Sequence, residues 1–234
     1  METGTRTCAA PPFAAGDERP CNVRWRPHDL LRLRRLASFD SEPDWVRAAF
    51  AAAPFAVVRR AQSAFGVIAI GVRGHGRAQR YGTWAEAADV EAVIAPEDLA
   101  DSLPADTERL ALPAFALYAD LRREAQSLAA FAWGPTGSVG FELASGVPTV
   151  TATSDLDLLI RAPRPLAREH AGQILSELES HAQRAGIRVD VQLETPAGGI
   201  ALAEWAAGKP RVMARHAQGP RLLADPWTAP AAPT

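Results

Sequence analysis

The clearest pattern of hydrophobic and polar positions lies in the second half of the chain. Residues 154–160 (SDLDLLI) alternate as a strand does, so Asp155 and Asp157 point to one side and the leucines that follow them point to the other. Residues 187–193 alternate in the same way, with apolar side chains on one side and Arg188, Asp190 and Gln192 on the other. Between these stretches, residues 165–185 have the period of an amphipathic helix, which Gly186 ends. The pattern predicts a buried strand, a helix and a second strand.

The rest of the chain is predicted to be a mixture of helices and strands. A short helix is expected to start at residues 26–31, with Leu30, Leu33 and Leu36 on one face. Further expected helices cover residues 41–53, 83–90, 114–130, 139–145 and 199–207. Expected strands cover residues 55–60 and 65–72, and a hairpin joins residues 212–215 to residues 221–224. This mixture predicts the α/β fold class, more specifically α+β.

Charge divides the chain into two parts. Residues 23–80 contain 11 arginines and 4 acidic residues, whereas residues 83–124 contain 3 arginines and 10 acidic residues, so their formal charges are +7 and −7. This asymmetry predicts that one half of the protein binds an anion. The expected order is a disordered tail (1–22), a small Arg-rich α+β domain (23–112), a catalytic domain with a mixed sheet flanked by helices (113–228), and a second tail (229–234).

The overall composition argues against several classes of protein. The 234 residues are 47% hydrophobic and 22% charged, which is typical of a soluble globular protein. The net charge of −2 provides no basic field for nucleic acid, and Cys8 and Cys21 match no metal-ligand spacing. A membrane span and a secretory signal are also not evident, so the cytoplasm is the expected location.

Asp155 and Asp157 are the candidate catalytic residues. Two carboxylates on one face of a strand repel each other, and a divalent cation such as Mg²⁺ or Mn²⁺ neutralises such a pair through oxygen ligands. Gly137-Ser138 precedes them at the expected start of a helix, where backbone N–H groups favour a phosphate. If the strand of Asp190 lies beside that of Asp157, a third carboxylate completes a site for phosphoryl transfer.

This order of elements resembles the nucleotidyltransferase fold of the DNA polymerase β type over residues 133–193, with additional residues around 146–153. A closer resemblance, over residues 23–227, is to the malonate decarboxylase holo-acyl-carrier-protein synthases, a family of phosphoribosyl-dephospho-CoA transferases. The sequences that carry this closer resemblance are RPHDLL (26–31), VVRR (57–60), GVRG (71–74) and the whole block 133–161.

The resemblance implies a specific reaction. A 2′-(5″-phosphoribosyl)-3′-dephospho-CoA group passes from its triphosphoribosyl donor to a serine of the acyl-carrier-protein subunit of malonate decarboxylase, and pyrophosphate leaves. Asp155 and Asp157 are then the catalytic metal ligands, and the wider superfamily adds Asp190. The phosphate-rich donor requires a basic surface, for which the candidates are Arg59, Arg60, Arg73, Arg77 and Arg80. Alternatively, this surface receives the carrier protein.

Other functions are compatible with the same residues. Within the same fold, the chain could adenylylate a protein or a small molecule, or it could modify the carrier of citrate lyase, which bears the same group. Glycosyltransferases with an Asp-X-Asp motif also use Mn²⁺, but they give the Gly-Ser helix no role. A non-enzymatic module that binds a carrier protein is the alternative from a different class, and the presence of all three acidic residues argues against it.

Overall fold

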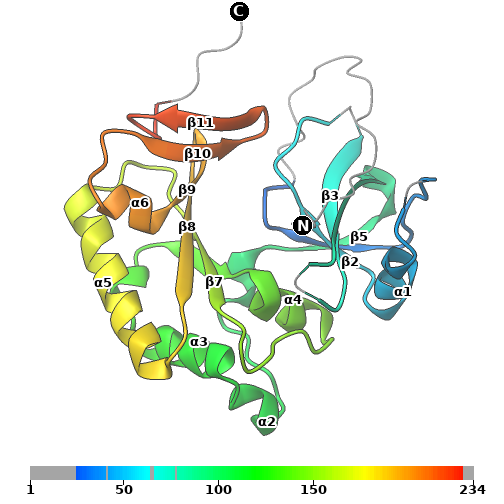
Figure 1. Cartoon of the computed structure of the whole chain (residues 1–234), viewed down its shortest axis with the longest axis horizontal. Coiled ribbons are helices and arrows are strands. Elements are labelled where there is room, and N and C mark those ends of the chain that lie inside the picture. Colours follow the sequence, from blue (N-terminus) through cyan, green and yellow to red (C-terminus); the bar gives the residue numbers. More distant parts are fainter. Residues whose placement is uncertain (1–24, 41, 64–65, 77, 229–234) are drawn as a thin grey trace, which may run out of the picture. The chain divides into compact units, whose positions relative to one another are not determined.

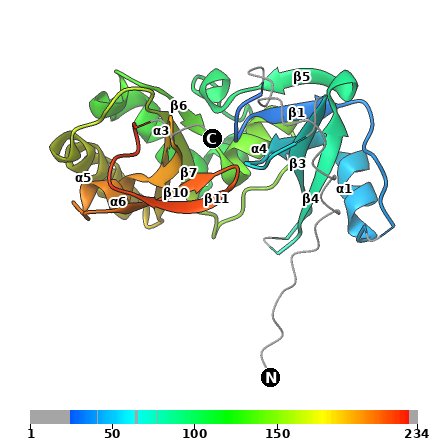
Figure 2. The same cartoon turned by 90° about the horizontal axis from the view of Figure 1, so that it is seen from above.

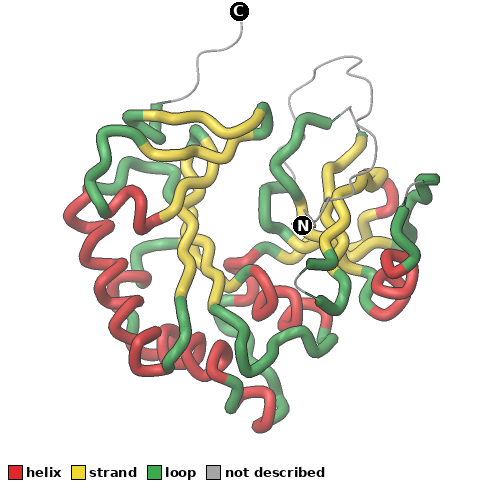
Figure 3. Tube along the Cα trace, viewed as in Figure 1, coloured by secondary structure: helices red, strands yellow, loops and turns green. Residues whose placement is uncertain are grey.

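The computed structural model describes residues 25–40, 42–63, 66–76 and 78–228, so both predicted tails lie outside the described residues (Figure 1). The chain forms two compact units, which divide between Ala95 and Pro96. The sequence had suggested a division between residues 112 and 113. Pro96 belongs to the second unit, and its carbonyl oxygen lies so close to Gly134 that a Cβ atom there would overlap it. Helices and strands both contribute substantially (Figure 3), and the predicted α+β class is confirmed.

Among its described residues, the first unit contains an antiparallel sheet of five strands in the order β4-β3-β2-β1-β5. The strands are β1 (Leu30–Leu33), β2 (Phe55–Val58), β3 (Val67–Arg73), β4 (Arg80–Glu86) and β5 (Val90–Ile94). Helix α1 (Trp45–Ala52) packs against β3 (Figure 2), and the 3₁₀ turn η1 (Ala87–Asp89) links β4 to β5. Val46 and Ala49 of α1 are buried in the core of this unit.

Two predicted helices of this unit are wrong. At residues 26–31, the Asp29 carboxylate accepts a hydrogen bond from the Arg26 N–H (2.8 Å), which closes a turn before β1. Strand β1 pairs with β2 on one side and β5 on the other, so its backbone groups are used by the sheet. Residues 83–90 contain most of β4 and then η1, because the chain pairs with β3 from Arg80 to Glu86.

The second unit contains a mixed sheet of six strands among its described residues, in the order β11-β10-β9-β8-β7-β6. The strands are β6 (Ala132–Pro135), β7 (Leu156–Arg161), β8 (Val189–Thr195), β9 (Gly198–Ala201), β10 (Val212–His216) and β11 (Gly219–Leu223). The helices are η2 (Pro96–Leu99), α2 (Thr107–Leu110), α3 (Pro113–Glu124), η3 (Gln126–Leu128), α4 (Gly137–Ser145), α5 (Arg168–Ala185) and α6 (Leu202–Ala206). Strand β7 begins two residues later and ends one residue later than the alternating stretch 154–160, and β9 replaces the first part of the helix predicted at 199–207.

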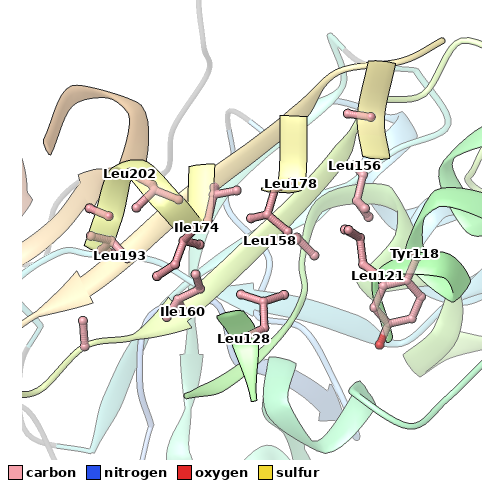
Figure 4. Close-up of a cluster of buried hydrophobic side chains, with 14 of the residues drawn as sticks. Tyr118, Leu121, Leu128, Leu156, Leu158, Ile160, Ile174, Leu178, Leu193 and Leu202 are labelled. Atoms are coloured by element: carbon pink, nitrogen blue, oxygen red, sulfur yellow. The ribbon is translucent and has the colours of Figure 1, made fainter. Parts of the chain in front are cut away.

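The core of the second unit covers one face of this sheet. Leu156, Leu158 and Ile160 of β7 pack with Ile174 and Leu178 of α5, and Tyr118 and Leu121 of α3 belong to the same cluster (Figure 4). Because side chains alternate along a strand, Asp157 points to the face opposite this core. In the described part of the chain, no helix is long and apolar enough to cross a bilayer.

Candidate active site

The pairing of β7 with β8 brings two of the predicted acidic residues together. These neighbouring strands run parallel, and Asp157 is the register partner of Asp190. Asp155 lies just before β7, and the N–H of Leu156 donates to the carbonyl of Arg188 (3.0 Å) just before β8. The structure therefore brings Asp155, Asp157 and Asp190 to the same end of two adjacent strands, which is the arrangement that the prediction for Asp190 required. Asp190 is exposed, and the other two are partly buried.

The Gly-Ser element lies directly against this end of β7. The N–H of Thr136 donates to the carbonyl of Asp157 (2.8 Å), and α4 then begins at Gly137. Gly137 has a φ of +57°, a conformation that side chains disfavour, and a Cβ atom there would overlap Oδ2 of Asp157. Glycine is therefore required for two reasons: its backbone conformation and the close approach of the carboxylate. The first turn of α4 and the Asp157 carboxylate are immediate neighbours.

A buried ion pair holds the loop between α4 and β7. The side chain of Glu142 is only 7% exposed, and Arg109 donates to both of its oxygens (2.8 and 2.7 Å). The N–H groups of Thr149 and Val150 donate to the same carboxylate (2.7 and 2.8 Å). Burial alone would raise the pKa of Glu142, but the hydrogen bonds from Arg109, Val150 and Thr149 outweigh it and lower that pKa.

This loop is also tied to Ser138, the second residue of the Gly-Ser pair. The Thr149 hydroxyl donates to the carbonyl of Ser138 (3.0 Å), and Ser138 is only 8% exposed. The additional residues around 146–153 are therefore anchored to the start of α4. Their backbone path is fixed by Glu142 and Thr149 together.

Arg188 is the cation that faces the three aspartates. It donates to Oδ2 of Asp155 at 2.7 Å; the arginine side chain is 72% exposed and the aspartate side chain 21% exposed. The hydrogen bond and charge of Asp155 raise the pKa of Arg188 most, and the charges of Asp190 and Asp157 raise it further. All three carboxylates therefore act on this one guanidinium.

The donor atoms suit Mg²⁺ or Mn²⁺, because three carboxylates at one place provide the oxygen ligands that these ions prefer. In this arrangement Asp155 is engaged by Arg188. Within the described residues, no group of three or more His, Cys, Asp or Glu side chains is assembled as a complete metal site. The residues therefore fit a divalent cation in the chemistry of their oxygen donors, while their side chains do not form a metal site in this arrangement.

The predicted arginines belong to the first unit. Strand pairing aligns Gly71 with Gly82 and Arg73 with Arg80. The side chain of Arg59 lies over both glycines, so a Cβ on Gly82 would overlap its guanidinium. Because residues two apart share a face, Arg59, Arg73 and Arg80 lie on one face of the sheet. Arg60 follows at a bend beyond β2, and Arg77 lies outside the described residues.

The sequence predictions missed three residues of the second unit. Arg188 could have been found, because it alternates with Asp190 on the polar side of the predicted strand. Arg109 and Glu142 are 33 residues apart, and no local pattern relates them. Only the folded chain reveals their pairing.

Comparison with known families gives the class of the protein. The N-terminal domain model of phosphoribosyl-dephospho-CoA transferase MdcG matches residues 26–96, and the C-terminal domain model of the same enzyme matches residues 99–226. The chain is thus similar to group-transferring enzymes in both of its units. No solved structure matches it.

Individual relatives identify the family. The phosphoribosyl-dephospho-CoA transferase of Pseudomonas aeruginosa is 46% identical over 202 residues, which cover 86% of this chain and 93% of the relative. Enzymes of the same name from Pseudomonas putida (strain W619) and Azotobacter vinelandii are 44% and 42% identical, over 86% of this chain and 95% and 94% of their own lengths. The chain belongs to the phosphoribosyl-dephospho-CoA transferase family.

The first prediction concerns the contact between Gly137 and Asp157. In Gly137→Ala, the new Cβ displaces the carboxylate, and we expect transfer activity to fall about a hundredfold, because displacements near 1 Å have effects of that size. Gly146→Ala is the matched control, since Gly146 also has a positive φ (+72°) but a Cβ there would meet nothing within 4 Å. Both variants should lose about 1 kcal/mol of stability. Equal transfer rates for the two variants would contradict the role of the contact.

The second prediction concerns the pH dependence of the Glu142 ion pair. Folding lowers the pKa of Glu142 from its ordinary value of 4.5, so the charged carboxylate stabilises the protein at pH values above 4.5. This contribution is lost as the pH falls below 4.5. Glu142→Gln should cost about 3 kcal/mol at neutral pH, the scale expected for a broken buried ion pair. Denaturant unfolding at several pH values should show this cost shrinking below pH 4.5. The exposed Glu179→Gln variant is the control, and a cost that is independent of pH would refute the prediction.

Proposed function

We propose that this enzyme transfers the 2′-(5″-phosphoribosyl)-3′-dephospho-CoA group from 2′-(5″-triphosphoribosyl)-3′-dephospho-CoA to a serine of the malonate decarboxylase acyl carrier protein, with release of pyrophosphate. The family to which the chain belongs supports the transferred group. The observation that carries the mechanism is the contact of Gly137 with Asp157, whose register partner is Asp190. This contact places the start of α4 beside the carboxylates of the proposed site.

The start of α4 provides the phosphate-binding part of the proposed site. The first N–H groups of a helix have no acceptor within the helix, and the helix dipole adds a partial positive charge there. Gly137 lets the backbone come close to a ligand, and the tie between Ser138 and Thr149 keeps this turn in place. We assign these groups to the phosphates that leave as pyrophosphate.

Asp155, Asp157 and Asp190 provide the acidic part of the proposed site. They would hold Mg²⁺ or Mn²⁺ through their carboxylate oxygens. Such an ion, when bound, polarises the α-phosphate and offsets negative charge on the leaving pyrophosphate. Asp190 is the exposed member of the set and pairs through its strand with Asp157. We therefore assign to Asp190 the further role of accepting the proton of the attacking serine hydroxyl.

The first unit carries a basic face of its own. Arg59, Arg73 and Arg80 share one face of the sheet, with Arg59 extended over Gly71 and Gly82. Guanidinium groups bind phosphate through paired hydrogen bonds, so this face suits the phosphate-rich donor. The carrier protein is the alternative occupant of the same basic face.

The third prediction tests the acidic residues with the carrier protein. Wild-type enzyme, Mg²⁺ and the triphosphoribosyl donor should add the mass of the prosthetic group to the malonate decarboxylase carrier, as measured by intact-protein mass spectrometry. Asp155→Asn and Asp157→Asn should each slow this gain by at least about a hundredfold, the size of effect seen when one preorganised electrostatic group is removed. Both variants should retain the wild-type circular dichroism spectrum and unfolding transition.

Controls in the same experiment separate the other functions. Asp120→Asn changes a partly exposed aspartate of α3 outside the site and should transfer normally. A carrier that lacks its acceptor serine should gain no mass. Transfer of an adenylyl group from ATP would show that ATP is the donor. Preferential modification of the citrate lyase carrier would show that this carrier is the acceptor. Full activity in either aspartate variant would refute the catalytic assignment.

A further inference from the structure

Arg188 and Asp155 form an ion pair where two parallel strands begin. Each lies just before its strand, and the hydrogen bond from the Leu156 N–H to the Arg188 carbonyl (3.0 Å) fixes the two segments side by side. The guanidinium then reaches Oδ2 of Asp155 at 2.7 Å. The backbone thus holds the two residues side by side, and the arginine side chain is the more exposed of the two.

The surroundings of Arg188 explain why a cation is needed here. Asp190 is two residues further along the same strand, on the same side as Arg188, and Asp157 is its register partner on β7. Three carboxylates gathered at one place repel one another unless a positive charge offsets them. Arg188 supplies that charge from within the chain.

The arginine side of the ion pair is exposed to solvent. The Arg188 side chain is 72% exposed, so water screens its attraction to Asp155. Water can also hydrate the guanidinium when the side chain turns away. A guanidinium bound to a carboxylate oxygen also keeps that oxygen from any other cation. Arginine, with its forked donors, suits a phosphate as well as it suits a carboxylate.

We propose that Arg188 is a positioning residue that holds Asp155 as a counter-ion in the free enzyme and moves to a phosphate of the bound donor when a divalent cation takes its place. This inference rests on the proposed metal-dependent function. It assigns to Arg188 opposite effects on two ligands: it weakens binding of the cation alone, and it strengthens binding of the phosphate group that follows. A residue that only stabilised the fold would not produce this opposition.

The fourth prediction measures binding of the cation alone. Mn²⁺ is titrated into the full-length free protein, and the free Mn²⁺ signal is followed by electron paramagnetic resonance. Arg188→Gln should bind Mn²⁺ about three- to tenfold more tightly than the wild type, the range expected when an exposed competing charge is removed. Arg188→Lys keeps the charge and should stay close to the wild type. Arg164→Gln removes an exposed arginine beyond the opposite end of β7 and should leave the affinity unchanged.

The same variants are then tested with pyrophosphate, the proposed leaving group, at saturating Mn²⁺. Isothermal titration calorimetry should show pyrophosphate binding to Arg188→Gln about tenfold more weakly than to the wild type, because one charge-assisted contact is lost. Arg188→Lys should fall between them, since lysine keeps the charge but loses the fork. Tighter Mn²⁺ binding together with weaker pyrophosphate binding supports the exchange.

The outcomes that overturn the inference differ from those that overturn the proposed function. If Asp157→Asn abolishes Mn²⁺ binding while Arg188→Gln binds Mn²⁺ no more tightly than the wild type, the metal site stands and the counter-ion role of Arg188 is wrong. Unchanged pyrophosphate affinity in Arg188→Gln also overturns the exchange. If Asp157→Asn binds Mn²⁺ as the wild type does, the metal site itself is wrong, and the inference falls with it.

Discussion

The arrangement of the candidate site depends on the parallel pairing of β7 with β8. The other strand pairs of the described sheets are antiparallel. This pairing makes Asp157 the partner of Asp190 and sets Asp155 opposite Arg188. Parallel strands need a long connection between them, and α5 provides it. The apolar side of α5 covers one face of the strands, so the polar side chains collect on the other face.

Each part of the site is held by contacts that also stabilise the fold. The leucines that alternate with Asp155 and Asp157 are fully buried, and this burial sets the direction of both carboxylates. The close approach of Gly137 ties the start of α4 to β7, and the Glu142–Arg109 pair fixes the loop between them. A shift of β7 by one residue would turn the aspartates into the core. The hydrophobic pattern and the chemistry of this strand therefore reinforce each other.

The two strands of the candidate site could be predicted better from the sequence than the first strand of the first unit. Alternation identified β7 and the polar face of β8. The prediction for Asp190 also required that these strands be neighbours, and they are. In the first unit, Leu30, Leu33 and Leu36 have the spacing of one face of a helix, but pairing with two neighbouring strands makes Leu30–Leu33 a strand. Local sequence patterns do not predict such long-range pairing, and they do not predict the contact between Arg109 and Glu142 either. The pattern placed Arg188 on the polar side of its strand, but it did not predict that Arg188 pairs with Asp155.

The proposed function requires that the three aspartates form one cation site beside the start of α4. Its most direct test is an anomalous difference map from crystals of the wild-type protein grown with Mn²⁺ and pyrophosphate. The account predicts Mn²⁺ ligated by Asp155, Asp157 and Asp190, pyrophosphate at the first turn of α4, and Arg188 turned from Asp155 to a phosphate. Mn²⁺ bound away from these aspartates, with Arg188 still paired to Asp155, would contradict it.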